Sequence, residues 1–100
     1  MTSVKITQED FKNATSCVDN FNCPLACALT RLKIPFDSVS GDFVTMKDNS
    51  LLKIKGVEDL KYAFICQETF KSYTTDEIDL FISRAKAGQE VPTIQLYLYD

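Results

Sequence analysis

The sequence predicts a small α+β domain, with a mainly antiparallel sheet of about four strands and two to three helices packed on one face. Three observations predict it. Two stretches repeat apolar residues at helical spacing, and others alternate apolar and polar residues as strands do. The chain has 100 residues and an apolar fraction of 45%, enough for one core. We therefore expect residues 1–100 to form a single domain.

The N-terminal segment predicts a strand followed by a short helix. Val4-Lys5-Ile6 alternates apolar and polar residues. Thr7 and Asp10 have the spacing of a loose capping box, and Ile6 and Phe11 have that of a hydrophobic staple.

The second helix has the clearest local signals. Asn22 or Cys23 is its cap, and Pro24 lies in the first turn, where a missing N–H does no harm. Ile34-Pro35 predicts its end, because the residue before a proline avoids the α region. The expected core-facing stripe is Leu25, Ala28, Leu29 and Leu32.

Residues 36–55 predict antiparallel strands. Phe43–Lys47 and Leu51–Lys55 are strand-like, and Phe36–Ser40 precedes them. Gly41-Asp42 and Asp48-Asn49-Ser50 have turn chemistry, so we expect a hairpin or a three-stranded meander.

Residues 57–70 leave two alternatives open. Val57, Leu60 and Phe64 fit a helix, which we favour at the start of the segment. Tyr62–Cys66 equally fits a buried strand.

The third helix begins with a strict capping box, Thr74 and Glu77, and a staple, Tyr73 and Ile78. Gly88 is expected at the C′ position that ends it. The apolar stripe is Ile78, Phe81, Ile82 and Ala85.

The last strand, Thr93–Tyr99, supplies a candidate interface. Gln95, Tyr97 and Tyr99 alternate with apolar residues and should lie on the face away from the core. A terminal strand often lies at a sheet edge, and tyrosine is enriched in interfaces, so we predict partner capture or homodimerisation there.

Several functional classes are disfavoured by composition. Histidine is absent, and the three glycines are isolated, so there is no Ser-His-Asp triad and no Gly-rich phosphate loop. The net charge is −3 with interleaved signs, which predicts no nucleic-acid partner. No apolar signal or membrane-spanning segment is seen, so we expect no membrane partner and a cytoplasmic location.

The four cysteines are expected to be reduced thiols in that compartment. The spacing of Cys17, Cys23 and Cys27 does not form paired zinc knuckles, so neither a metal nor another cofactor is predicted. No catalytic residue is assigned. Cys23 is the candidate reactive thiol, because a helix N-terminus stabilises a thiolate and lowers its pKa.

Several short segments carry a family resemblance. Ile6-Thr7-Gln8-Glu9, Cys23 to Leu29, Phe81-Ile82, Gly88, and Val91-Pro92 to Leu98 follow in this order over most of the chain except its middle. They resemble small uncharacterised proteins of bacteriophages and prophages, with Ala87 and Thr93 as departures from the pattern. The resemblance implies a phage or mobile-element origin, which would place the protein in the host cytoplasm, and it transfers no catalytic residue.

Three functions follow as hypotheses. The first is a non-enzymatic accessory protein that binds a host or viral protein. The second is a thiol-dependent enzyme or redox protein that uses Cys23. The third is a small-ligand or nucleotide-binding module. The small size and the lack of histidine favour the first.

Overall fold

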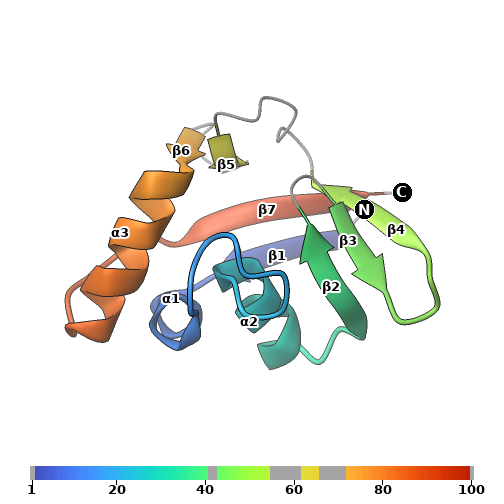
Figure 1. The fold of residues 1–100 in the computed structure, drawn as a ribbon, viewed down its shortest axis with the longest axis horizontal. Helices are drawn as coiled ribbons and strands as arrows, with labels where there is room; N and C mark the ends of the chain where they lie inside the picture. The colour runs from blue at the N-terminus through green and yellow to red at the C-terminus, as the bar shows by residue number, and fades with distance from the viewer. Residues whose placement is uncertain (1, 41–42, 55–61, 66–71, 100) are drawn as a thin grey trace.

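The computed structural model describes residues 2–40, 43–54, 62–65 and 72–99 (Figure 1). These residues contain three helices and seven strands. The helices are α1 (Gln8–Asn13), α2 (Pro24–Arg31) and α3 (Thr75–Lys86). The strands are β1 (Thr2–Ile6), β2 (Phe36–Ser40), β3 (Phe43–Met46), β4 (Leu51–Ile54), β5 (Tyr62–Ile65), β6 (Ser72–Thr74) and β7 (Ile94–Tyr99). The predicted α+β class is confirmed.

The main sheet is antiparallel throughout and has the strand order β1-β7-β4-β3-β2. The meander expected from residues 36–55 is β2-β3-β4. The first and last strands pair along their length, with Val4 opposite Leu96. The sheet therefore has five strands where the sequence predicted about four, and β5 and β6 form a separate pair.

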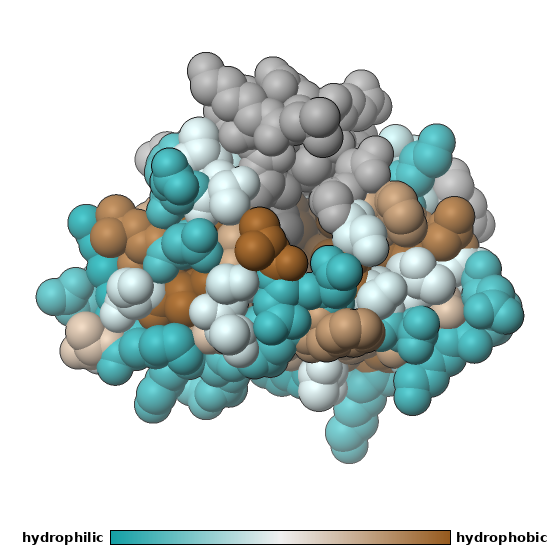
Figure 2. Space-filling view, in the orientation of Figure 1, coloured by the Kyte–Doolittle hydropathy of each residue, from teal (hydrophilic) through white to brown (hydrophobic). Residues whose placement is uncertain are grey.

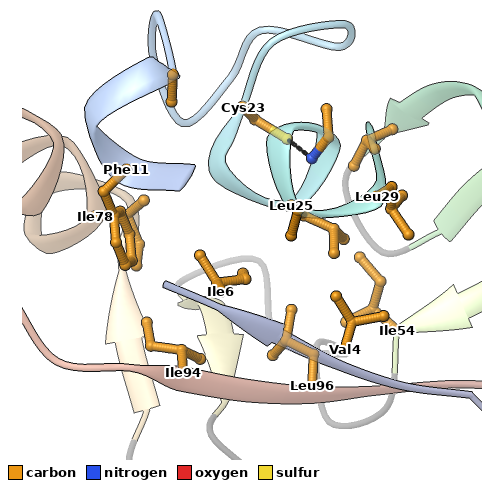
Figure 3. Close-up of a cluster of buried hydrophobic side chains, with 14 of the residues drawn as sticks. Val4, Ile6, Phe11, Cys23, Leu25, Leu29, Ile54, Ile78, Ile94 and Leu96 are labelled. Carbon is orange, nitrogen blue, oxygen red and sulfur yellow. Dashed lines mark hydrogen bonds between the residues drawn. The ribbon is translucent and has the colours of Figure 1, made fainter. Parts of the chain in front are cut away.

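The helices pack on one side of β1 and β7, and the core lies between them. Figure 3 shows Val4, Ile6, Ile94 and Leu96 pointing from the strands toward Leu25 in α2. All five side chains are fully buried. Among the described residues no helix has the length and apolar character needed to cross a membrane.

The capping signals are confirmed. The Thr7 amide donates to Asp10 Oδ2 at 2.8 Å at the start of α1. The Glu77 amide donates to Thr74 Oγ1 at 3.2 Å at the start of α3. Gly88, with φ +78°, adopts the left-handed conformation expected just past the end of α3.

The two predicted helical stripes lie in one core, with one exception: Leu32 is 42% exposed. The helix ends one turn earlier than Pro35 suggested. Leu32 is its C-cap, with its amide bonded to Ala28 O, and Lys33 has a left-handed φ of 58°. The chain thus leaves the helix directly after Leu32, whose side chain lies at the helix end.

The helix favoured at the start of residues 57–70 does not extend to Phe64, which lies in β5. Val57 and Leu60 fall outside the described residues, as do the Gly41-Asp42 turn and Cys66. The strand alternative is confirmed for Tyr62–Ile65, and β6 was not predicted. Three apolar positions are too few to distinguish a helix from a strand-forming run.

Candidate functional site

The loop between α1 and α2, residues 14–22, is closed by its own hydrogen bonds. The Thr15 amide donates to Asn22 O at 2.9 Å, and Asn22 Nδ2 donates to Thr15 Oγ1 at 2.6 Å. Asp19 Oδ1 accepts from the amides of Phe21 and Asn22, both at 2.9 Å. The two bonds to Asp19 satisfy backbone amides that no helix or sheet pairs.

The same loop is fixed to two other elements. The Cys17 amide donates to Asp79 Oδ1 in α3 at 2.8 Å. The Val39 amide in β2 donates to Asn20 O at 2.8 Å. These two bonds attach the loop to α3 on one side and to β2 on the other.

Two apolar side chains of this loop face solvent. Val18 is 74% exposed and Phe21 is 70% exposed, the highest values among the large apolar side chains of the described residues. We call this pair the loop patch. In Figure 2, brown apolar surfaces lie among teal polar ones on the face that carries the loop. Full burial of such a side chain contributes roughly 1.5–3 kcal/mol to the free energy of unfolding. Most of this contribution is absent here, because both side chains stay in solvent.

The candidate thiol Cys23 is the N-cap of α2 and is only 2% exposed. The Ala26 amide donates to its Sγ at 3.4 Å (Figure 3). Burial raises the pKa of the Cys23 thiol, and the backbone N–H groups at the helix end oppose this rise without overcoming it. This direction is opposite to the lowered pKa expected from the cap, and the role of Cys23 as a reactive thiol stays a prediction.

The pKa values of the two neighbouring thiols are raised as well. Burial, followed by the nearby Asp79 carboxylate, raises the pKa of Cys17 to about 12. Burial, followed by Asp10, raises the pKa of Cys27 to about 11. In the part of the chain that the structure describes, no three Cys, Asp or Glu side chains are grouped to hold a metal ion.

An ion pair between the buried Asp10 and the more exposed Arg31 joins α1 to α2. Asp10 is 2% exposed, and its carboxylate accepts from Arg31 Nε at 3.0 Å and from Arg31 Nη2 at 3.1 Å. Arg31 Nη2 also donates to Lys5 O in β1 at 2.8 Å. Thr7 supplies two further donors to Asp10. This cluster, which we call the Asp10 clasp, holds β1, α1 and α2 together.

Beside the clasp lies a shallow cleft of about 290 Å³ between α1 and α2. One of its lining residues, Asn22, follows Phe21 of the loop patch in the sequence. We call it the α1–α2 cleft. Its lining residues are Glu9, Asp10, Asn13, Asn22, Cys27, Thr30 and Arg31.

The predicted interface residues Gln95, Tyr97 and Tyr99 are half-buried and alternate with the buried residues of β7. Gln95 Nε2 donates to Ser3 Oγ at 2.6 Å. The expectation that the last strand is an edge is wrong, since β7 lies between β1 and β4. The role of these three residues as an interface stays a prediction, now on a sheet face and not at an edge.

No protein-family model matches the chain, and neither a curated protein nor a solved structure matches it. The site therefore has to be interpreted from its own chemistry.

The loop patch was missed at the sequence level. Residues 14–22 have no helical or strand periodicity, and apolar residues in such a stretch are normally assigned to the core. The available signal was Asp19-Asn20, a turn-forming pair, flanked by Val18 and Phe21. A turn at that position makes outward-facing side chains plausible on both sides of it.

Proposed function

We propose that this chain is a non-enzymatic accessory protein, of phage or mobile-element type, that binds a protein partner through the loop patch. The observation that carries the proposal is the exposure of Val18 and Phe21 on a loop whose backbone is fixed by hydrogen bonds.

Fixed backbone matters because binding is opposed by the entropy lost on ordering a loop. A loop that is already ordered avoids most of that loss. Aromatic side chains are enriched in interfaces, where a few of them contribute most of the binding energy. A rigid loop with one phenylalanine and one valine in solvent has the features of such an anchor.

The helix α3 next to the loop also exposes a large apolar side chain. Asp79 bonds the backbone next to Val18, and the following residue, Leu80, is 48% exposed.

The two alternative functions have less support. A thiol enzyme needs a thiolate, whereas burial raises the pKa of Cys23. A nucleotide-binding module needs hydrogen-bond donors for phosphate. In the α1–α2 cleft the guanidinium of Arg31 is already paired with Asp10, and the carboxylate of Glu9 would repel a phosphate. The phage or mobile-element origin rests on the sequence segments described above.

The test compares the wild-type chain with a Val18→Ser/Phe21→Ser variant as bait in lysate of infected and uninfected host cells. The wild type should retain a partner that the double variant loses, while circular dichroism shows both to be folded. Leu51→Ser is the matched control, because Leu51 is 54% exposed in β4, outside the loop. A partner retained equally by the double variant, or no partner at all, would overturn the proposal.

A third bait separates this patch from the sheet face. Tyr97→Ala/Tyr99→Ala should retain the partner if the loop patch is the docking surface. Loss of the partner with this variant, and not with the loop variant, would transfer the interface to β7.

A further inference from the structure

The α1–α2 cleft offers hydrogen-bond acceptors and few donors. Among the described residues, the one side-chain donor to Glu9 is Asn13 Nδ2, at a long 3.4 Å. Asn22 Oδ1 accepts the weak S–H of Cys27 at 3.3 Å. The Thr30 hydroxyl donates to Ala26 O and keeps its lone pairs. A ligand group that donates several hydrogen bonds is what this lining lacks.

The charges around the cleft point the same way. The charge of Arg31 is matched by Asp10 in a two-bond contact, so the carboxylate of Glu9 remains without a partner charge there. After burial, Asp10 has the largest effect in raising the pKa of the Cys27 thiol, and Lys86 opposes it. The local field thus favours a cation over an anion.

We propose that the partner presents an arginine whose guanidinium enters the α1–α2 cleft, next to an apolar residue that packs on the loop patch. Guanidinium carries five donors in a planar fork, which suits acceptors spread over Glu9, Asn22 and Thr30 better than the compact ammonium of lysine. The proposal rests on the proposed function, because the arginine is presented by the same partner that the loop patch would bind.

The experiment titrates the ¹⁵N-labelled chain with three small probes and follows its amide NMR signals. The probes are acetyl-arginine amide, acetyl-leucyl-arginine amide and acetyl-leucyl-citrulline amide, in which neutral citrulline replaces arginine. Both arginine probes should shift the signals of Glu9, Asn13 and Thr30, and the citrulline probe should not. Equal shifts with citrulline, or no shifts with any probe, would overturn the inference.

Variants refine the test. Glu9→Gln should weaken the arginine probes by about tenfold, the effect expected for one charge-assisted hydrogen bond. Asp76→Asn is the control, since Asp76 is an exposed carboxylate at the start of α3 that does not line the cleft. Unchanged binding in Glu9→Gln would contradict the inference. Val18→Ser/Phe21→Ser should reduce the affinity of the leucyl probe to that of acetyl-arginine amide.

The two proposals fail separately. A partner captured through Val18 and Phe21, with no arginine probe in the cleft, overturns the arginine inference alone. Arginine probes that bind the cleft, with partner capture unaffected by the loop variant, overturn the proposed function alone.

Discussion

Replacing Arg31 by leucine tests whether the Asp10 clasp acts as a buried ion pair. The substitution removes both hydrogen bonds from the guanidinium to Asp10 and the one to Lys5 O. The carboxylate, which is 2% exposed in the wild type, then keeps the two donors of Thr7. A carboxylate left in that state has lost most of its hydration and its counter-charge.

The expected loss can be bounded from the geometry. Breaking a fully buried pair by removing one partner costs about 3–5 kcal/mol. The Arg31 side chain is 37% exposed, so water can approach Asp10 when it is removed. We therefore expect Arg31→Leu to lower the free energy of unfolding by about 2–3 kcal/mol. Asp10→Asn, which keeps an acceptor and removes the charge, should cost about 1–2 kcal/mol.

The double variant gives the decisive comparison. Without a charge at position 10, the loss of Arg31 leaves no unpaired ion, so Asp10→Asn/Arg31→Leu should be at least about 1 kcal/mol more stable than the two single effects predict when added. Urea unfolding followed by far-ultraviolet circular dichroism measures all four proteins. Arg84→Leu is the control, an exposed arginine on α3 whose loss should stay within about 0.5 kcal/mol. Strict additivity would refute the ion-pair account.

Three further outcomes follow from burial, backbone conformation and pKa. Leu29→Ala should lower the free energy of unfolding by about 2–5 kcal/mol, because this side chain is fully buried. Leu32→Ala should lower it by less than about 0.5 kcal/mol, because Leu32 is 42% exposed. Equal urea midpoints for the two variants would contradict this. Gly88→Ala should lower the free energy of unfolding by about 1 kcal/mol, and Gly88→Asn by less. The positive φ is the cause, since nothing lies within 4 Å of an added Cβ. An alanine variant that melts at the wild-type temperature would contradict this. Because burial raises the pKa of Cys17 from 9.0 to about 12, the unfolded chain loses this proton first, so stability should fall between pH 9 and 12 by at most about 1.4 kcal/mol per pH unit. Urea titrations at several pH values should show a shallower fall in Cys17→Ala, and parallel slopes would exclude the effect.

Features that depend on near neighbours in the chain were predictable from the sequence. The two members of each capping box, Thr7 with Asp10 and Thr74 with Glu77, lie three positions apart. The box can therefore be recognised from a short stretch of sequence. Gly88 ends α3 for an equally local reason. The strand alternation of residues 94–99 likewise gave the correct buried face.

Features that depend on distant partners were not predictable in this way. The place of β7 inside the sheet depends on its pairing with β1, where Val4 lies opposite Leu96. These two residues are separated by most of the sequence. The Asp10 clasp joins residues 21 positions apart. The helix dipole at Cys23 is a local effect, but the burial that reverses its consequence comes from the rest of the core.

Stability and binding are separable in the loop between α1 and α2. The side chain of Asp19 accepts two backbone amides, so Asp19→Ala should cost about 1–2 kcal/mol and speed amide hydrogen exchange at Phe21 and Asn22. Phe21, at 70% exposure, contributes little burial to the folded state, so Phe21→Ser should change the free energy of unfolding by less than about 0.5 kcal/mol. A serine there would serve folding as well as the phenylalanine does, in agreement with the partner-binding role proposed above for the aromatic ring. If Phe21→Ser instead unfolds as readily as Asp19→Ala, the ring is part of the core and the loop patch is not a docking surface.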